Sequence, residues 1–245
     1  MRTAWEEAGW EQLGDGVARR RMAGWDETIG VIAGSAGVMI VDTGATLRDG
    51  ADLRRTVRGV LGRDVTHVAL THPHFDHVLG TAAFAGVQVF GATGLGDLLR
   101  RSKDTLRDDA VRHGVDPDAA AEAADLLVAP HHHVHGQLTV DLGDRQVLLA
   151  NVGPGHTAHD LAVLAPGRHG GREIVFCGDL VEESGEPQAG RDALPQRWPA
   201  ALDRLLALGG EDALYVPGHG AAVDAAFVRA QREALATRFG VAPAS

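Results

Sequence analysis

Short apolar runs bounded by glycine-containing turns recur along most of the 245-residue chain. Such runs are typical of strands that are buried on at least one face. They predict strands at residues 17–22, 28–33, 37–41, 65–70, 87–90, 138–142, 146–152, 161–164, 173–177 and 213–216. The turn-like segment 34–37 and the pair Gly143-Asp144 predict that the strands flanking each of them form a hairpin.

Segments with helical periodicity lie between these strands. In the segment 50–61, Leu53 and Val57 share one apolar face, Asp49 is placed to cap the start, and Gly62 is placed to end the helix. The same criteria predict helices at 95–101, 106–113, 117–128, from about 199, and at 224–239. The mixture of strands and helices predicts an α/β fold. Because no tandem repeat or low-complexity linker interrupts it, the whole chain, 1–245, is interpreted as one domain.

The segment Thr71-His72-Pro73-His74-Phe75-Asp76-His77 follows the predicted strand 65–70 and is rich in side chains that bind metals. Imidazole and carboxylate groups are the usual ligands of zinc and related divalent ions. The proline stiffens the turn and removes one backbone donor, which suits a fixed loop that presents side chains. A polar surface loop is the alternative, but the ordered H-x-H-x-D-H pattern favours a loop that divides its ligands between two metals.

Three further residues of the same chemical kind follow predicted strands and glycine-containing turns: His156, Asp179 and His219. Residues that follow strands gather at one edge of a sheet, where α/β proteins place their sites. Two metal ions that share a carboxylate would use the whole set. The seven candidate metal ligands are His72, His74, Asp76, His77, His156, Asp179 and His219.

The segment 91–136 lies between two parts of this ligand set and carries three of the predicted helices. A helical lid or wall over the site is one interpretation, and a peripheral packing element is the other. The sequence leaves both open.

The histidine loop, preceded by Asp42-Thr43-Gly44 and followed by Gly155-His156-Thr157, Gly178-Asp179 and Gly218-His219-Gly220, resembles the metallo-β-lactamase fold superfamily over most of the chain. The resemblance implies a four-layer αββα sandwich, with a helical insertion at about 91–136 and a dinuclear metal site at one edge. It implies that Asp42 supports the histidine loop from behind. Its implied ligand sets are His72, His74 and His156 for the first metal, Asp76, His77 and His219 for the second, and Asp179 as the bridge.

The same resemblance implies a hydrolase that uses a metal-bridging hydroxide to cleave an ester, lactone, thioester or amide of a small molecule. Zinc is the preferred metal, with iron or manganese as alternatives, and Asp76 is the candidate catalytic residue that orients the nucleophile or carries its proton. An iron-dependent redox enzyme similar to persulfide dioxygenases is one alternative, although the complete second ligand set disfavours it. A true β-lactamase is another, although Cys177 is displaced by two residues from the ligand position that the best-known branch fills with cysteine.

Composition narrows the possible partners. The formal net charge of −10 argues against a nucleic-acid partner, which requires clustered basic residues. The one cysteine excludes an intrachain disulfide, and neither a signal peptide nor a membrane-spanning apolar stretch is recognisable. We therefore expect a cytoplasmic protein without nucleic-acid or membrane partners.

Several other conspicuous residues have simpler interpretations. Cys177 is predicted to be a small buried apolar residue, with an orientation toward the metal ligands as the alternative, because it has the same strand parity as Asp179. The His131–His135 run is predicted to be a solvated loop, with a substrate-facing role for one histidine as the alternative. Trp198 is predicted to pack at a helix start. The Arg19–Arg21 run is predicted to lie on an exposed edge strand. His159-Asp160 are predicted to be polar residues at a strand entry, with support of the metal ligands as the alternative.

Overall fold

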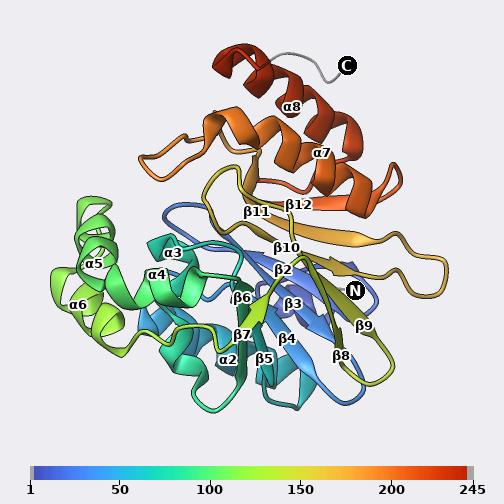
Figure 1. The fold of residues 1–245 in the computed structure, drawn as a ribbon. Helices are drawn as coiled ribbons and strands as arrows, with labels where there is room; N and C mark the ends of the chain where they lie inside the picture. Colours follow the sequence, from blue (N-terminus) through green and yellow to red (C-terminus); the bar gives the residue numbers. More distant parts are fainter. Residues whose placement is uncertain (1–2, 242–245) are drawn as a thin grey trace.

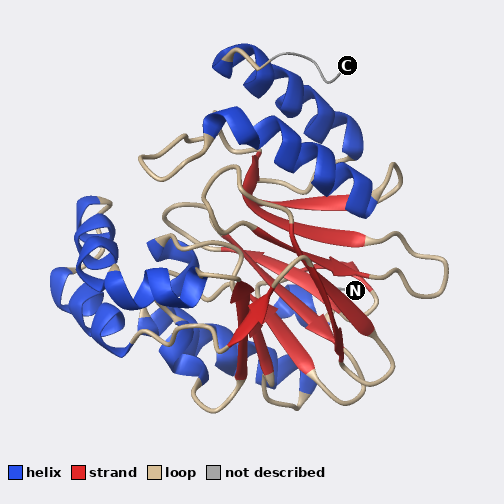
Figure 2. Cartoon of the chain, in the orientation of Figure 1, coloured by secondary structure: helices blue, strands red, loops and turns tan. Residues whose placement is uncertain are grey.

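The computed structural model describes residues 3–241. Two β-sheets pack face to face, and helices cover the outer face of each sheet (Figures 1 and 2). This arrangement confirms the predicted α/β class and the four-layer αββα order.

The first sheet contains seven strands in chain order, antiparallel from β1 to β4 and parallel from β4 to β7. The parallel part places the carboxyl ends of its strands at one edge, which is where the histidine loop follows β5. The strands are β1 Glu11–Gly14, β2 Val17–Arg21, β3 Thr28–Ala33, β4 Val38–Val41, β5 His67–Ala69, β6 Gln88–Ala92 and β7 His132–Val134.

The second sheet contains five strands in the order β12-β11-β10-β9-β8. Its neighbours are antiparallel except β11 and β12, which run parallel. The strands are β8 Gln137–Asp141, β9 Gln146–Asn151, β10 Leu161–Ala165, β11 Ile174–Glu182 and β12 Leu214–His219.

Helices form the outer layers. In Figure 1, α7 and α8 cover the second sheet at the top of the view, and α4, α5 and α6 project to the left of the first sheet. The helices are α1 Ala4–Glu7, α2 Leu47–Leu61, α3 Phe75–Val78, α4 Leu95–Arg101, α5 Lys103–Arg112, α6 Pro117–Leu126, α7 Trp198–Gly209 and α8 Ala225–Phe239, with 3₁₀ turns η1 Thr81–Phe84 and η2 Pro195–Arg197.

Three apolar layers hold the sandwich together. Neighbouring residues of a strand point to opposite faces of its sheet, so Met39 of β4 packs between the sheets with Phe176, while Ile40 packs against Leu53 of α2. Leu202 of α7 belongs to the third layer, over the second sheet. Full burial of one such side chain stabilises the fold by about 1.5–3 kcal/mol.

The first long helix begins earlier than the sequence predicts. α2 starts at Leu47 because Thr46, not Asp49, is its N-cap residue. The Thr46 hydroxyl accepts a hydrogen bond from the Asp49 N–H at 3.1 Å and donates one to the Asp49 carboxylate at 2.7 Å. Thr46 and Asp49 are both residue types that cap helices, and their positions in the sequence do not decide which one is the N-cap.

The prediction of an exposed edge strand for the arginine run was wrong. β2 is an inner strand, because β1 pairs along its other side. Arg19 is only 3% exposed, donates to Glu11 Oε2 at 2.7 Å and donates to the Gly220 carbonyl at 2.9 Å. The short, polar β1 has too little apolar pattern to be recognised from sequence.

The segment 91–136 is mostly helical, as predicted, but it ends in β7, which pairs in parallel with β6. Part of the His131–His135 run therefore belongs to a sheet rather than to a loop. In the part of the chain that the structure describes, no helix is long and apolar enough to cross a membrane.

Candidate metal centre

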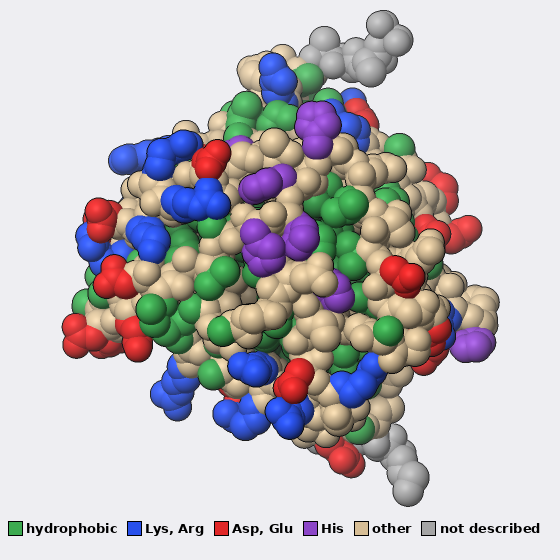
Figure 3. Space-filling model, turned by 60° about the horizontal axis from the view of Figure 1, so that its bottom comes forward, with side chains coloured by type: hydrophobic (Ala, Val, Ile, Leu, Met, Phe, Trp, Pro, Cys, Tyr) green, Lys and Arg blue, Asp and Glu red, His purple; other side chains and the backbone are tan. Residues whose placement is uncertain are grey.

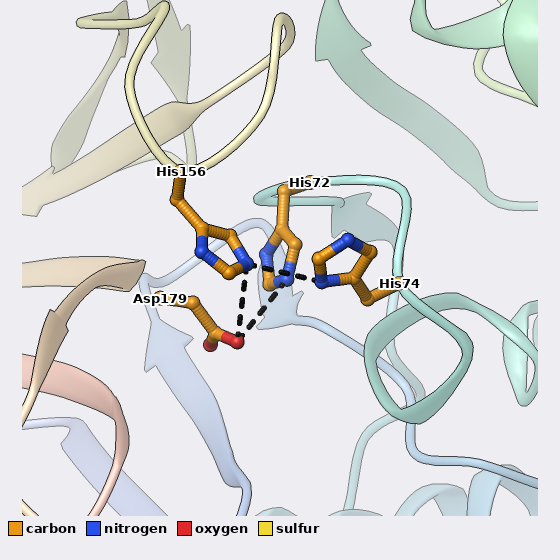
Figure 4. A group of neighbouring side chains, drawn as sticks. All are labelled: His72, His74, His156 and Asp179. Carbon is orange, nitrogen blue, oxygen red and sulfur yellow. Dashed lines mark hydrogen bonds and ion pairs between the residues drawn. The ribbon is translucent and has the colours of Figure 1, made fainter. Parts of the chain in front are cut away.

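Two groups of potential metal ligands lie side by side at one edge of the sandwich. In each group, the candidate ligand atoms all lie within 4.8 Å of one another. The first group contains His72, His74, His156 and Asp179 (Figure 4), and the second contains Asp76, His77 and His219. The structure thus brings together all seven residues singled out from the sequence.

Asp179 connects the two groups. Its Oδ2 lies 3.5 Å from Nε2 of both His72 and His156 in the first group. Its Oδ1 lies 3.2 Å from Nε2 of His77, and its Oδ2 lies 3.5 Å from Nε2 of His219, in the second group. One carboxylate therefore faces ring nitrogens of both groups, which is the position a bridging ligand requires.

Asp179 reaches this position from inside β11, not from a turn after it. The sequence interpretation ended this strand at Cys177, whereas β11 continues to Glu182 with an irregular register around Gly178. Gly178 has a φ of +54°, a conformation that residues with a Cβ rarely adopt. A Cβ at Gly218 of β12 would lie 1.8 Å from Asp179 Oδ1, so only glycine allows this close approach.

Asp42 holds the histidine loop from behind. Its Oδ1 accepts the Thr71 N–H at 2.8 Å, and its Oδ2 accepts the Thr71 hydroxyl at 2.7 Å. The same Oδ2 lies 2.9 Å from His77 Nδ1, so this ring nitrogen donates and Nε2 is left facing the second group. Thr71 Oγ1 lies 2.9 Å from His72 Nδ1 and orients that ring in the same way.

Two other contacts that orient ligands were not recognised from the sequence. His74 Nε2 lies 3.1 Å from Asp192 Oδ2, which leaves Nδ1 facing the first group. His219 Nδ1 donates to the Trp25 carbonyl at 2.7 Å, which leaves Nε2 facing the second group. Asp192 lies in a loop far along the chain, and a backbone carbonyl leaves no signal in residue types, so neither contact could be read from a motif.

Asp160 shapes the loop that presents His156. Its carboxylate accepts the Thr157 N–H at 2.9 Å and the Thr157 hydroxyl at 2.6 Å. Asp160 precedes β10, as the sequence predicted, but its side chain also fixes the turn beside a candidate ligand. Burial raises the pKa of Asp160 to about 7, although the hydrogen bonds from Thr157 favour the charged form.

Burial opposes charge on every member of the two groups, but the outcome differs between them. The histidines outweigh burial at Asp76 and Asp179 and hold the pKa of both carboxyls well below its usual value. At His72 and His156 burial prevails and lowers the pKa of both imidazoles. Charged carboxylates and neutral imidazoles are the forms that bind metals. At the other three histidines burial lowers the pKa but the carboxylates raise it more: Asp192 raises the pKa of His74, Asp76 raises that of His77 well above its usual value, and Asp179 raises that of His219 to about 11. Bound cations would replace these protons.

The residues present fit a pair of metal ions. His72 Nε2, His77 Nε2 and Asp179 Oδ1 are buried, and none has a hydrogen-bond partner among the described residues. Buried polar atoms are costly when unpaired. The three atoms lie close together where the two ligand groups meet. Cations bound there would give each of them a partner.

A pocket of about 750 Å³ opens over the two groups, and His74, Asp76, His156, Asp179 and His219 line it. One wall comes from α4 and α5, in the segment 91–136, and the opposite wall comes from the loop 182–192. The helical segment is therefore a wall of the pocket, which favours the first of its two interpretations.

Other residues singled out from the sequence are not members of the ligand groups. Cys177 is 1% exposed and belongs to the apolar layer under α7, because the irregularity at Gly178 breaks its shared orientation with Asp179. Trp198 is fully buried, as predicted, and its ring also lies 5.2 Å from that of His156.

The His131–His135 run is not part of either ligand group. His132 stacks on Phe90 with ring centroids 4.5 Å apart, whereas His131, His133 and His135 are exposed. Figure 3 shows a face on which histidines gather near the centre, with basic and acidic side chains interspersed around them. Because His132 and His133 belong to β7, the prediction of a solvated loop is correct only for His131 and His135.

Comparison with known proteins gives the class. A sequence model of the metallo-beta-lactamase superfamily matches residues 23–219. A curated relative, metallo-beta-lactamase domain-containing protein 1 of Xenopus laevis, is 27% identical over 197 residues, which cover 80% of this chain and 71% of the relative. The chain therefore belongs to the metallo-beta-lactamase superfamily, as the sequence resemblance implied.

Solved structures agree on the fold. A metallo-beta-lactamase from Pontibacter korlensis superposes with a TM-score of 0.73 at 21% identity, covering 92% of this chain and 97% of that chain. The DIM-1 metallo-beta-lactamase superposes with a TM-score of 0.71 at 19% identity, covering 94% and 97%. At these identities the likeness shows the fold alone.

Proposed function

We propose that the protein is a hydrolase that uses two divalent metal ions, with zinc as the preferred metal, to cleave an ester, lactone, thioester or amide of a small molecule. The position of Asp179 carries this proposal, because its one carboxylate lies within 3.5 Å of histidine nitrogens from both ligand groups. His72, His74 and His156 would hold one ion, Asp76, His77 and His219 the other, and Asp179 both.

When bound, such a pair of ions lowers the pKa of water toward neutrality and polarises a substrate carbonyl. The protein's own contribution is position and proton handling. Asp76 lines the pocket, and its Oδ2 lies 3.3 Å from Nε2 of both His77 and His219. We assign Asp76 the catalytic role of orienting the nucleophile or carrying its proton.

Metal removal and reconstitution test the proposal. We expect zinc-loaded protein to contain about two equivalents of zinc and to hydrolyse at least one member of a panel of lactones, thioesters, carboxylic esters and amides. Exhaustive chelation should abolish the activity, and added zinc should restore it. Full activity in chelated protein would overturn the proposal.

A single ligand substitution gives a sharper form of this test. His156→Ala removes one ligand from the first group and should lower kcat/KM by about two orders of magnitude. A normal rate in His156→Ala would refute the ligand assignment. Protein purified without added metal distinguishes the alternatives, because one equivalent of iron with oxygen consumption would indicate a redox enzyme, and preference for β-lactams within the panel would indicate a β-lactamase.

A further inference from the structure

The two walls of the pocket differ in chemistry. The loop wall presents mainly polar groups, including Ser184, Gln188 and Asp192. The helical wall presents Leu98 of α4 and Leu106 of α5 among polar side chains such as Thr105, Asp109 and Arg112, and the floor beside it presents apolar rings. Large apolar side chains therefore line one side of the pocket only, and a substrate gains binding free energy by placing an apolar part against them.

Aromatic rings extend the apolar side down to the ligand groups. Phe75 stands between the ligands His74 and Asp76 in the chain. Trp25 meets Phe75 edge-on, with ring centroids 5.4 Å apart, and both residues line the pocket. Apolar side chains thus line the pocket from the candidate metal centre to α4 and α5, as a surface interrupted by polar side chains.

Hydrogen bonds fix this surface relative to the metal centre. The Trp25 indole N–H donates to the His113 carbonyl at the end of α5 at 3.2 Å, and the His113 ring stacks on Phe75 at 5.2 Å. The Trp25 carbonyl accepts the bond from His219 Nδ1 at 2.7 Å. One residue therefore connects the helical wall to the second ligand group, and the distance between apolar surface and reaction site is set by the fold.

We propose that Trp25, Phe75, Leu98 and Leu106 form a subsite that binds a hydrocarbon chain of the substrate, so that the preferred substrates are esters or thioesters with a chain of several carbons. This inference rests on the proposed hydrolase function. The hydrocarbon chain belongs either to the acyl group of the substrate or to its leaving group. In both cases it lies directly beside the scissile bond.

Two series of substrates distinguish these sources. The first series is p-nitrophenyl acetate, butanoate, hexanoate and octanoate, in which only the acyl chain grows. The second is the S-ethyl to S-octyl thioesters of acetic acid, in which only the leaving group grows. With zinc-loaded protein, kcat/KM should rise along one series by up to about fourfold per added methylene, since burial of one methylene is worth about 0.8 kcal/mol.

A matched pair of variants locates the effect. Leu98→Ser removes an apolar side chain from the pocket wall and should reduce the preference for the longest over the shortest substrate by about tenfold. Leu126→Ser makes the same change in α6, where Leu126 is 54% exposed and does not line the pocket. The preference in Leu126→Ser should equal that of the unchanged protein.

Binding provides a readout that needs no turnover. Calorimetric titration should show octanoate binding at least about tenfold more tightly than butanoate, and Leu98→Ser should remove the difference. Failure to hydrolyse any ester, thioester, lactone or amide would overturn the proposed function, while tighter octanoate binding would still support the subsite. Flat profiles in both series, or equal binding of octanoate and butanoate, would overturn the subsite and leave the hydrolase proposal standing.

Discussion

The two ligand groups share Asp179, but the protein holds them in different ways. In the second group, His77 is oriented by Asp42, and their side chains are 0% and 2% exposed. In the first group, His74 is oriented by Asp192, and their side chains are 25% and 48% exposed. One group is fixed from the core of the sandwich, and the other is fixed partly from a loop at the pocket mouth.

This difference suggests that the two groups depend on different parts of the protein for the orientation of their ligands. Contacts behind a metal ligand tune its orientation and basicity, and a buried contact is screened less by solvent than an exposed one. His77 is thus held through the core of the fold, whereas the orientation of His74 depends on where the loop 182–192 lies. Substitutions that act on both groups, on one, or on neither should separate these contributions.

Asp179→Asn acts on both groups and should have the largest effect. The substitution keeps the side-chain shape but replaces the charged oxygen pair that faces both sets of nitrogens. We expect zinc content to fall from about two equivalents to one or fewer, and kcat/KM to fall by about 10³. Elemental analysis and ester hydrolysis measure the two quantities. Asp203→Asn, at an exposed carboxylate paired with Arg232, is the control; two retained zinc equivalents in Asp179→Asn would remove Asp179 from the bridging position.

Asp42→Asn acts directly on His77 of the second group, through Thr71 on His72 of the first group, and on the stability of the fold. Asn is chosen because Asp42 has a φ of +63°, which Asn tolerates better than Ala. The new amide places a donor opposite the Thr71 hydroxyl or His77 Nδ1, which also donate. We expect a loss of about 2–4 kcal/mol in the free energy of unfolding of the metal-free protein, measured by urea denaturation.

The control for Asp42→Asn is Asp64→Asn, at a side chain that is 47% exposed and pairs with Arg58 at 3.1 Å. An exposed ion pair contributes little, so the free energy of unfolding should change by less than about 1 kcal/mol. Equal effects of the two substitutions would mean that the second group is not anchored through Asp42.

Asp192→Ala acts on the loop-held group and should have a smaller effect. Loss of the contact to His74 Nε2 should lower the affinity of the first ligand group for zinc by about 10–100-fold. The free energy of unfolding of the metal-free protein should stay within about 1 kcal/mol, because the pair is partly exposed. Competition with a chromogenic chelator measures the affinity. Asp192→Asn retains an oxygen acceptor and should recover most of the affinity for zinc. If the affinity of Asp192→Asn is as low as that of Asp192→Ala, the carboxylate does more than orient His74.

The same contrast explains what the sequence could predict. Ligand-type residues of the histidine loop occur together in the chain, and glycines mark the backbone around Asp179 and His219, so all seven members were recognisable. Asp42 was recognised only through the family resemblance. Asp192 and the Trp25 carbonyl depend on how distant loops fold back over the site, and no local pattern encodes that.

Elements of the fold follow the same rule. Strongly apolar strands such as β3, β4 and β10 were recognised because burial dictates their residues. The polar β1 and the short β7 were missed, since their pairing is set by neighbouring strands rather than by their own pattern. Missing β1 also misplaced the arginine run at the sheet edge.

Cys177→Ala acts on neither group and should have the smallest effect on metal binding. The Cys177 thiol donates to the Val175 carbonyl at 3.2 Å within the apolar layer under α7, and burial raises its pKa above the usual value for a thiol. Truncation removes one buried sulfur and should cost about 1 kcal/mol in the free energy of unfolding, while zinc content and kcat/KM stay unchanged. A loss of zinc in Cys177→Ala would mean that the irregularity at Gly178 does not separate this residue from Asp179, and that the strand can present either side chain to the metal centre.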